Sequence, residues 1–135
     1  MRSIRLFVSR PLLDRRNTSP IFHHGGGHYA GFVLVTKHCK YITDAAAHSI
    51  AEFFVMRKYR KMGIGKQAAQ DVFDMFPGLW EVRVLHINVT AIPFWSKVIT
   101  EYTGGTHTFH PIPIADWEGL GYTFNSRKNT NEGGE

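Results

Sequence analysis

A strand that runs into a basic, glycine-bearing turn and then into an amphipathic helix limits the fold of this sequence more than any other feature. Residues 49–56 form an apolar stretch, as expected of a central strand covered on both faces. The turn spans residues 57–65, and a helix is expected over 66–76, where apolar residues recur at helical spacing. A second strand, rich in valine, is expected over 80–87. Two strands joined by a helix in this way form a crossover unit within one sheet.

The stretches on either side of this unit are expected to extend the sheet with antiparallel strands. Residues 20–24 and 28–35 flank a run of three glycines and predict a hairpin. A second helix, capped by Thr90, follows the second strand, and residues 106–112 and 121–125 predict a last strand pair. The fold class is therefore α/β (α+β): a mixed, largely antiparallel sheet with one central strand–helix–strand crossover.

The composition fits a single domain of moderate positive charge. The 135 residues are 43% hydrophobic and carry a net charge of +5, which favours an anionic partner without choosing among nucleic acid, a membrane surface and a phosphorylated ligand. The longest apolar run, residues 32–35, is far shorter than the ~20 residues that span a bilayer. Cys39 is the single cysteine, which fits a reducing compartment. We therefore expect a cytoplasmic protein that does not insert into a membrane.

The turn at residues 57–65 has the chemistry of an anion site. Gly63 and Gly65 let the backbone curl so that successive N–H groups point into one concavity, and the following helix adds the positive end of its dipole. Such a site binds a pyrophosphate without any side chain. Basic residues crowd the same region: Arg57, Lys58, Arg60, Lys61 and Lys66. These residues alone leave open an ordinary helix start with solvated charges.

A dinucleotide-binding fold competes for the same residues, because the run from Gly63 to Ala68 also matches the GxGxxG/A pattern. That fold requires an acidic residue about 20 residues further on, at the end of the next strand, to hold the ribose. Residues 83–91 contain no acid. The turn also lies in mid-chain after a hairpin instead of opening a run of parallel units, so we set the dinucleotide interpretation aside.

Two motifs resemble those of the GNAT superfamily of acetyl-CoA-dependent N-acetyltransferases. The first is a strand ending in valine and then R/Q-x-x-G-x-G/A opening a helix, and it is matched by Val55, Arg60, Gly63 and Gly65. The second is N-x-x-A-x-x-Φ-aromatic after the next strand, and it is matched by Asn88, Ala91, Phe94 and Trp95. The resemblance covers residues 20–125 and extends to a bacterial group of predicted acetyltransferases. It leaves 1–19 as a shortened or non-standard N-terminal segment and 126–135 as a polar tail expected to be disordered.

The resemblance implies acetyl-CoA as co-substrate, no metal, and a primary amine of a small molecule or peptide as acceptor. Main-chain groups of residues 53–55 would pair with the pantetheine arm like an added strand, and Asn88 would hydrogen-bond it where the two central strands diverge. Main-chain amides from Lys61 to Lys66 would hold the pyrophosphate. The implied cofactor-binding set is Phe53, Phe54, Val55, Arg60, Lys61, Met62, Gly63, Ile64, Gly65, Lys66, Asn88 and Trp95.

The transfer needs a group that takes a proton from the amine, because a lysine-like amine has a pKa of about 10.4 and is protonated at pH 7. Glu52 is the candidate base, since it is the only carboxylate within the strand beside the thioester. Regular alternation would put Glu52 and Val55 on opposite faces, unless a bulge re-aims the strand. His48 is the alternative base, and an ion pair between Glu52 and an arginine is the structural alternative.

Three other features leave alternatives open. Trp95 stands where many relatives place a tyrosine that protonates the leaving thiolate; indole N–H does not release its proton, so either water supplies the proton or Trp95 is a core residue. His23, His24 and His28 flank the glycine turn, but adjacent strand residues point to opposite faces, so no metal site is expected there. Cys39 has no group that would orient a Cys–His nucleophile.

The acetyltransferase interpretation has two competitors of different classes. One is a degenerate GNAT fold that binds acyl-CoA without catalysis. The other is a basic nucleic-acid-binding module, which is disfavoured because no helix presents a continuous basic face. A shortened N-terminal unit would expose sheet surface, so a homodimer is also considered.

Overall fold

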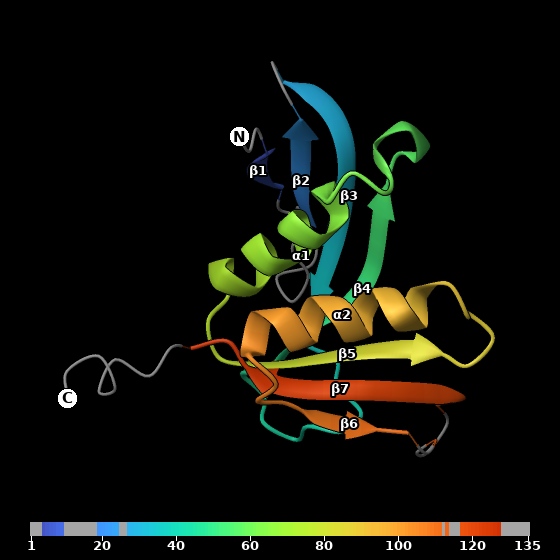
Figure 1. Cartoon of the computed structure of the whole chain (residues 1–135). Helices are drawn as coiled ribbons and strands as arrows, with labels where there is room; N and C mark the ends of the chain where they lie inside the picture. Colours follow the sequence, from blue (N-terminus) through green and yellow to red (C-terminus); the bar gives the residue numbers. More distant parts are fainter. Residues whose placement is uncertain (1–3, 10–18, 25–26, 112, 114–116, 128–135) are drawn as a thin grey trace.

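The structure, a computed structural model, describes residues 4–9, 19–24, 27–111, 113 and 117–127, with side chains from Pro20 onward. Seven strands and two α-helices make up the fold (Figure 1). In chain order the elements are β1 (Ile4–Ser9), β2 (Ser19–His24), β3 (His28–Thr36), β4 (His48–Val55), the 3-10 turn η1 (Arg57–Tyr59), α1 (Ile64–Met75), β5 (Leu79–Leu85), α2 (Ala91–Thr103), β6 (Thr108–His110) and β7 (Gly119–Asn125).

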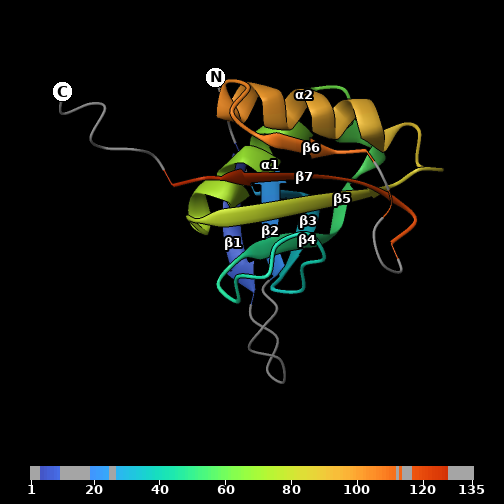
Figure 2. The same ribbon diagram turned by 90° about the horizontal axis from the view of Figure 1, so that it is seen from below.

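All seven strands belong to one sheet, in the order β1-β2-β3-β4-β5-β7-β6. Every neighbouring pair is antiparallel except β4 and β5, which are parallel and joined by α1. The predicted fold class, a mixed and largely antiparallel sheet with one strand–helix–strand crossover, is therefore confirmed. Both helices lie on the same face of the sheet, as the view from below shows (Figure 2).

Aromatic rings from both helices and from the sheet fill the core. Phe73 on α1 is fully buried and lies edge-on to Trp80, Tyr102 and Phe124, with ring centroids 4.9 to 5.2 Å apart. Edge-to-face pairs of this kind contribute about 0.5–1.5 kcal/mol each beyond the burial of their area. Because the four rings come from α1, β5, α2 and β7, they fix both helices against the part of the sheet that β5 and β7 form.

Several element boundaries differ from those predicted. The helix α1 begins at Ile64 and not at residue 66, because Gly63 adopts a left-handed φ of 78° that ends the turn. The strand β5 ends at Leu85 instead of residue 87, and β6 is only three residues long. The last strand pair, β6 and β7, is present. β7 lies between β5 and β6, so β6 forms the edge of the sheet.

The part of the N-terminal segment that the structure describes is a strand. β1 pairs antiparallel with β2 from Ile4↔His24 to Ser9↔Ser19 and forms the edge of the sheet. Residues 10–18 lie outside the described part of the chain, as do residues 128–135 of the expected polar tail. None of the described helices is long and apolar enough to cross a membrane.

Candidate active site

The central strands β4 and β5 pair only at their first residues and then diverge. The ladder consists of His48↔Trp80 and Ser49↔Glu81, and no further pair joins the two strands in the described chain. Figure 1 shows β4 and β5 running in clearly different directions beyond this point. From Ile50 to Val55, β4 therefore has no partner strand on its β5 side, and the main-chain groups on that edge are open to a ligand.

The turn beyond the end of β4 curls at Gly63 as predicted, whereas Gly65 already belongs to α1. Lys61 and Gly63 adopt left-handed φ values of 67° and 78°. The first amide of α1 to bond back is that of Gln67, which donates to the carbonyl of Gly63 at 3.1 Å. By helix geometry the N–H groups of Ile64 and Gly65 have no acceptor within the helix. A turn with alternating left-handed residues at a helix N-terminus is a concavity suited to an anion.

Two of the expected cofactor-binding side chains contact the protein itself. The Nε of Arg60 donates to the carbonyl of Val55 at 2.9 Å and so closes the turn against the end of β4. The Nζ of Lys66 lies 2.9 Å from Oε1 of Glu101 on α2. At this exposed position the Lys66 pair contributes little to stability. The main chain of the turn is thus the part best placed to hold phosphate.

Gly65 lies where α1, β4 and α2 approach one another. A Cβ atom at this position would lie 3.4 Å from the Val55 side chain and 3.5 Å from the ring of Phe94. These are ordinary contacts, so the fold tolerates a small side chain here. Gly63 differs, because its left-handed backbone strains any other residue although open space surrounds it.

Thr90 stands at the predicted N-cap position of α2, but the capping hydrogen bonds are accepted by Asn88. Thr90 has helical backbone angles, and its side chain makes no capping hydrogen bond. The Oδ1 of Asn88 accepts from the N–H of Ala91 at 3.3 Å, and its carbonyl accepts from the N–H of Ile92 at 3.3 Å. Asn88 is exposed just beyond the end of β5, whereas the turn lies beyond the end of β4.

Trp95 is a core residue. It is 6% exposed and lies edge-on to Phe53 on β4 and Phe94 on α2, with ring centroids 5.1 and 5.0 Å away. Phe53 also lies 5.7 Å from the ring of Phe94, and its two contacts hold the start of α2 against β4. Core packing, one of the two alternatives for Trp95, therefore accounts for this residue.

Glu52 lies beside a bulge in β4. The register passes from Leu34↔Glu52 to Val35↔Ile50, so Ala51 has no cross-strand partner on β3. Because of this extra residue, Ile50 and Phe53 both face the helices, whereas Glu52 and Phe54 face the opposite side. Glu52 is exposed there, and the bulge does not bring it onto the face of Val55.

His48 lies at the other end of β4 from the turn. Its ring packs on Phe76 and Trp80, with centroids 5.1 and 5.6 Å away. Burial, and secondarily the positive charge of Lys37, lower the pKa of His48. The structure therefore does not bring His48 together with Val55 and the turn.

The histidines and the cysteine singled out in the sequence occupy separate places. The ring of His23 lies near Tyr29 and that of His24 near Tyr59. Within the described ranges, no three His, Cys, Asp or Glu side chains are grouped so that they could hold a metal ion. Burial, and then the charge of Glu81, raise the pKa of Cys39 to about 11, so its thiol is unreactive at neutral pH.

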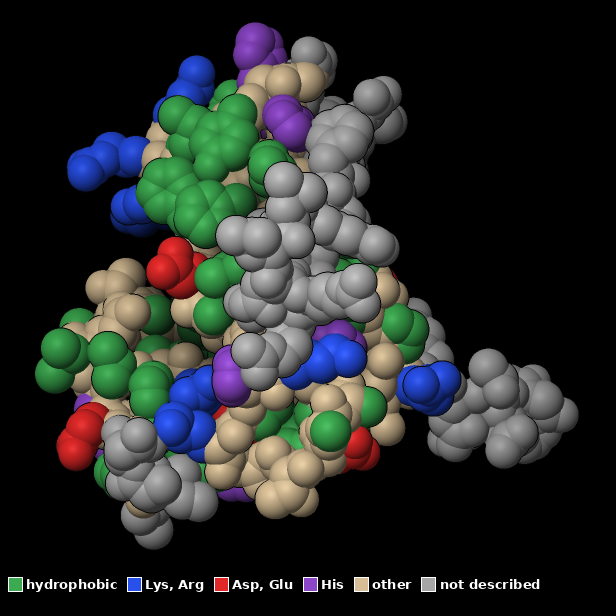
Figure 3. Space-filling model, turned by 180° about the vertical axis from the view of Figure 1, so that it is seen from behind, with side chains coloured by type: hydrophobic (Ala, Val, Ile, Leu, Met, Phe, Trp, Pro, Cys, Tyr) green, Lys and Arg blue, Asp and Glu red, His purple; other side chains and the backbone are tan. Residues whose placement is uncertain are grey.

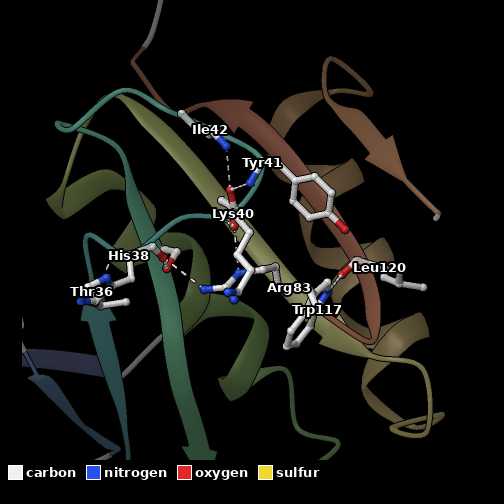
Figure 4. Close-up of polar contacts among 10 residues, drawn as sticks. Thr36, His38, Lys40, Tyr41, Ile42, Arg83, Trp117 and Leu120 are labelled. Carbon is white, nitrogen blue, oxygen red and sulfur yellow. Dashed lines mark hydrogen bonds and ion pairs between the residues drawn. The ribbon is translucent and has the colours of Figure 1, made fainter. Parts of the chain in front are cut away.

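A buried carboxylate that the sequence did not single out joins the loop before β4 to β5. Glu81 is fully buried and accepts the main-chain N–H groups of Lys40, Tyr41 and Ile42 at 2.7 to 3.1 Å (Figure 4). Its Oε2 also lies 2.8 Å from Nε of Arg83. A charged residue in the valine-rich stretch 80–87 was the only sequence signal for this buried carboxylate. Glu81 has a structural role and lies where β4 and β5 begin to diverge.

One pocket of 460 Å³ lies away from the turn, near the start of β5. Its lining residues come from the loop between β3 and β4, from β5, β6 and β7, and from the segment after α2: Ile42, Leu79, Gly105, Thr106, His107, Thr108, Thr123, Phe124 and Asn125. None of them belongs to the expected cofactor-binding set, so the pocket is unrelated to the diverging strands.

An open edge on the central strand, ending in a left-handed turn at a helix N-terminus, defines the fold of an acyl-CoA-dependent acyltransferase. The family model described as "Acetyltransferase (GNAT) family" matches residues 5–99. The chain therefore belongs to the GNAT family of acetyltransferases, and the predicted family and enzyme class, an acyltransferase, are confirmed. A direct search of curated protein sequences gave no match.

Solved acetyltransferases share the fold. An acetyltransferase from Bacillus subtilis, solved in complex with CoA, superposes with a TM-score of 0.60 over 93% of this chain and 99% of its own, at 13% identity. A spermidine N-acetyltransferase mutant from Vibrio cholerae gives 0.62 over 85% of this chain and 67% of its own, at 8% identity. An IAA acetyltransferase from Bacillus cereus gives 0.62 over 91% and 99%, at 10% identity. At these identities the likeness concerns the fold.

Proposed function

We propose that the protein transfers the acetyl group of acetyl-CoA to a primary amine by direct attack. One observation carries the proposal: β4 keeps an open edge from Ile50 to Val55, and that edge ends at a turn whose amides can hold a pyrophosphate. The edge and the turn together match the two parts of acetyl-CoA, an amide-bearing arm and a phosphate group.

The position of the thioester follows from the direction of the arm. With the pyrophosphate in the turn, the pantetheine arm would run back along β4 and pair with main-chain groups of residues 53–55. The distance along β4 from Val55 to Glu52 is about 10 Å, at about 3.3 Å per residue. The pantetheine arm is longer than this distance, so it would bring the thioester to the bulge at Ala51, beside Glu52. Asn88 would lie across the space between the diverging strands β4 and β5.

The chemistry requires three steps, and the chain offers a group for two of them. The amine nitrogen attacks the thioester carbonyl carbon, and the Glu52 carboxylate takes the proton that the amine loses. A main-chain N–H of the β4 edge stabilises the oxyanion. The C–S bond then breaks, and the thiolate takes a proton from water, because Trp95 is packed into the core.

Aspartate substitutions in the turn test the proposal. Gly65→Asp and Gly63→Asp each place a negative charge where the pyrophosphate would lie, so acetyl-CoA affinity measured by calorimetry should fall at least about tenfold. Gly104→Asp is the matched control, since Gly104 has the left-handed φ of 65° but ends α2 away from the turn. Affinity that is unchanged in both turn variants contradicts the proposal.

A further inference from the structure

The sheet face opposite the two helices carries a partly exposed aromatic pair next to the proposed base. Phe54 on β4 and Phe32 on β3 are cross-strand partners, and their ring centroids lie 5.8 Å apart. Phe54 is 39% exposed, although it lies near the middle of the sheet. Figure 3 shows hydrophobic side chains gathered on this face, bordered by lysines and arginines. The pair is therefore an apolar surface that the protein's own helices do not cover.

The carboxylate of Glu52 is on the same face as this pair. Residues two apart on a strand point the same way and lie about 7 Å apart, so Phe54 follows Glu52 at that spacing. Leu34, opposite Glu52 on β3, continues the apolar surface and is partly buried. A carboxylate thus stands at the rim of an aromatic surface, one same-face position along β4 from Phe54.

The charge around the pair suits a single ammonium group. Among the described residues of β2, β3 and β4, Glu52 is the one carboxylate. The other described acids lie on α1, on α2, in loops or, in the case of Glu81, buried beneath the loop before β4. Exposed Arg57 and Lys58 follow β4 directly and would repel a second cation. Among the described residues, a polyamine would find no second carboxylate on these strands for its remaining ammonium groups.

We propose that the acceptor is a monoamine with an aromatic group, and that Phe54 and Phe32 select it by packing against its ring. The inference rests on the acetyltransferase function proposed above and names the acceptor class for that same site. Glu52 binds the ammonium group and then takes its proton, while the aromatic pair holds the body of the acceptor. Phe53, which alternates with these residues, packs against Trp95 on the helix side and has no part in the selection.

The test compares three amines at saturating acetyl-CoA: phenethylamine, ethylamine and spermidine. The wild type should use phenethylamine with a kcat/KM at least about tenfold above that for spermidine. Phe32→Ala, in the ring of the pair that lies outside the cofactor-binding set, should lower kcat/KM for phenethylamine about tenfold, mainly through KM, and leave that for ethylamine nearly unchanged. Phe32→Leu keeps an apolar side chain without a ring and should show an intermediate loss. Phe109→Ala, which removes a ring 46% exposed on β6, is the matched control and should change neither.

The outcomes separate this inference from the function on which it rests. If calorimetry shows no acetyl-CoA binding, the proposed function itself fails. If acetyl-CoA binds and spermidine is used as well as phenethylamine, the function stands and the acceptor class is wrong. An equal loss for phenethylamine and ethylamine in Phe32→Ala would overturn the selective role of the aromatic pair. A change confined to oligomeric state, seen by size-exclusion chromatography, would make this face an interface between copies of the chain.

Discussion

Glu52 is the residue on which the proposed transfer depends, because it is the carboxylate of β4 and lies beside the bulge where the thioester is expected. Glu52→Gln keeps the shape and hydrogen bonding of the side chain but removes its ability to take a proton. We expect kcat to fall about 10²–10⁴-fold while acetyl-CoA affinity and melting temperature barely change. Glu118→Gln, at an exposed carboxylate before β7, is the control for charge loss and should stay fully active. A lower melting temperature with little change in rate would instead support the structural ion pair.

Residues whose roles follow from the main chain could be predicted, and those whose roles depend on distant partners could not. Gly63 indicates a curled turn because glycine permits the left-handed φ that the turn needs. The direction of a long side chain is set by whatever lies beside it after folding. Lys66 reaches Glu101, 35 positions away in the chain, and local sequence does not indicate that partner. Arg60 turns back only five positions to a main-chain carbonyl, that of Val55, which no side chain in the sequence marks.

The two ends of the strand β4 have different roles: its C-terminal end carries the proposed site, and its start belongs to the core. The turn and Glu52 lie towards its C-terminus, whereas His48 at its start packs on Phe76 and Trp80. The apolar stretch predicted the strand, but the bulge at Ala51 could not be predicted, because it depends on the register with β3. Without that bulge Glu52 would share the face of Ile50 and point into the core beneath the helices.

The pKa of His48 gives a test of its structural role at this end of β4. Burial holds the folded-state pKa below the unfolded value of about 6.5, so the stability associated with neutral His48 is present above that value and is lost as pH falls through the folded pKa. The wild type should therefore lose more melting temperature between pH 7 and pH 5 than His48→Phe does. The variant should keep its acetyl-transfer rate at pH 7. A large fall in kcat in a variant with normal stability would place His48 in the chemistry.

At the scale of the whole molecule, the sheet consists of two halves that share only a short ladder. Strands β1 to β4 form one half and β5, β7 and β6 the other, and two residue pairs join them. The loop between β3 and β4 strengthens the junction from the face opposite the helices (Figure 2). It is held by Glu81 on β5, and the ring of Tyr41 stacks on His110 of β6 at 4.4 Å. This junction lets β4 and β5 diverge beyond it without separating the halves.

Glu81→Gln tests whether the loop holds the two halves together. The change leaves Arg83 without its charged partner and replaces one oxygen that accepts main-chain N–H groups with an amide donor. Breaking a buried pair from one side costs about 3–5 kcal/mol, so the melting temperature should fall by about 10 °C or more. Glu101→Gln, at the exposed Lys66 pair, is the matched control and should have little effect.

The reactivity of Cys39 gives a second test of the loop between β3 and β4, and this test does not measure stability. Burial and the charge of Glu81 both raise the pKa of its thiol, which reaches about 11, so thiolate is scarce at pH 8.5 and iodoacetamide should react slowly with the folded wild type. Glu81→Gln removes the charge and loosens the loop, and both changes lower the pKa of Cys39. Alkylation at pH 8.5, followed by mass spectrometry under conditions where the variant remains folded, should therefore be several-fold faster in Glu81→Gln than in the wild type or Glu101→Gln. Equal alkylation rates in all three proteins would mean that the loop stays closed without Glu81, and the packing of Tyr41 and His110 would then be its main attachment.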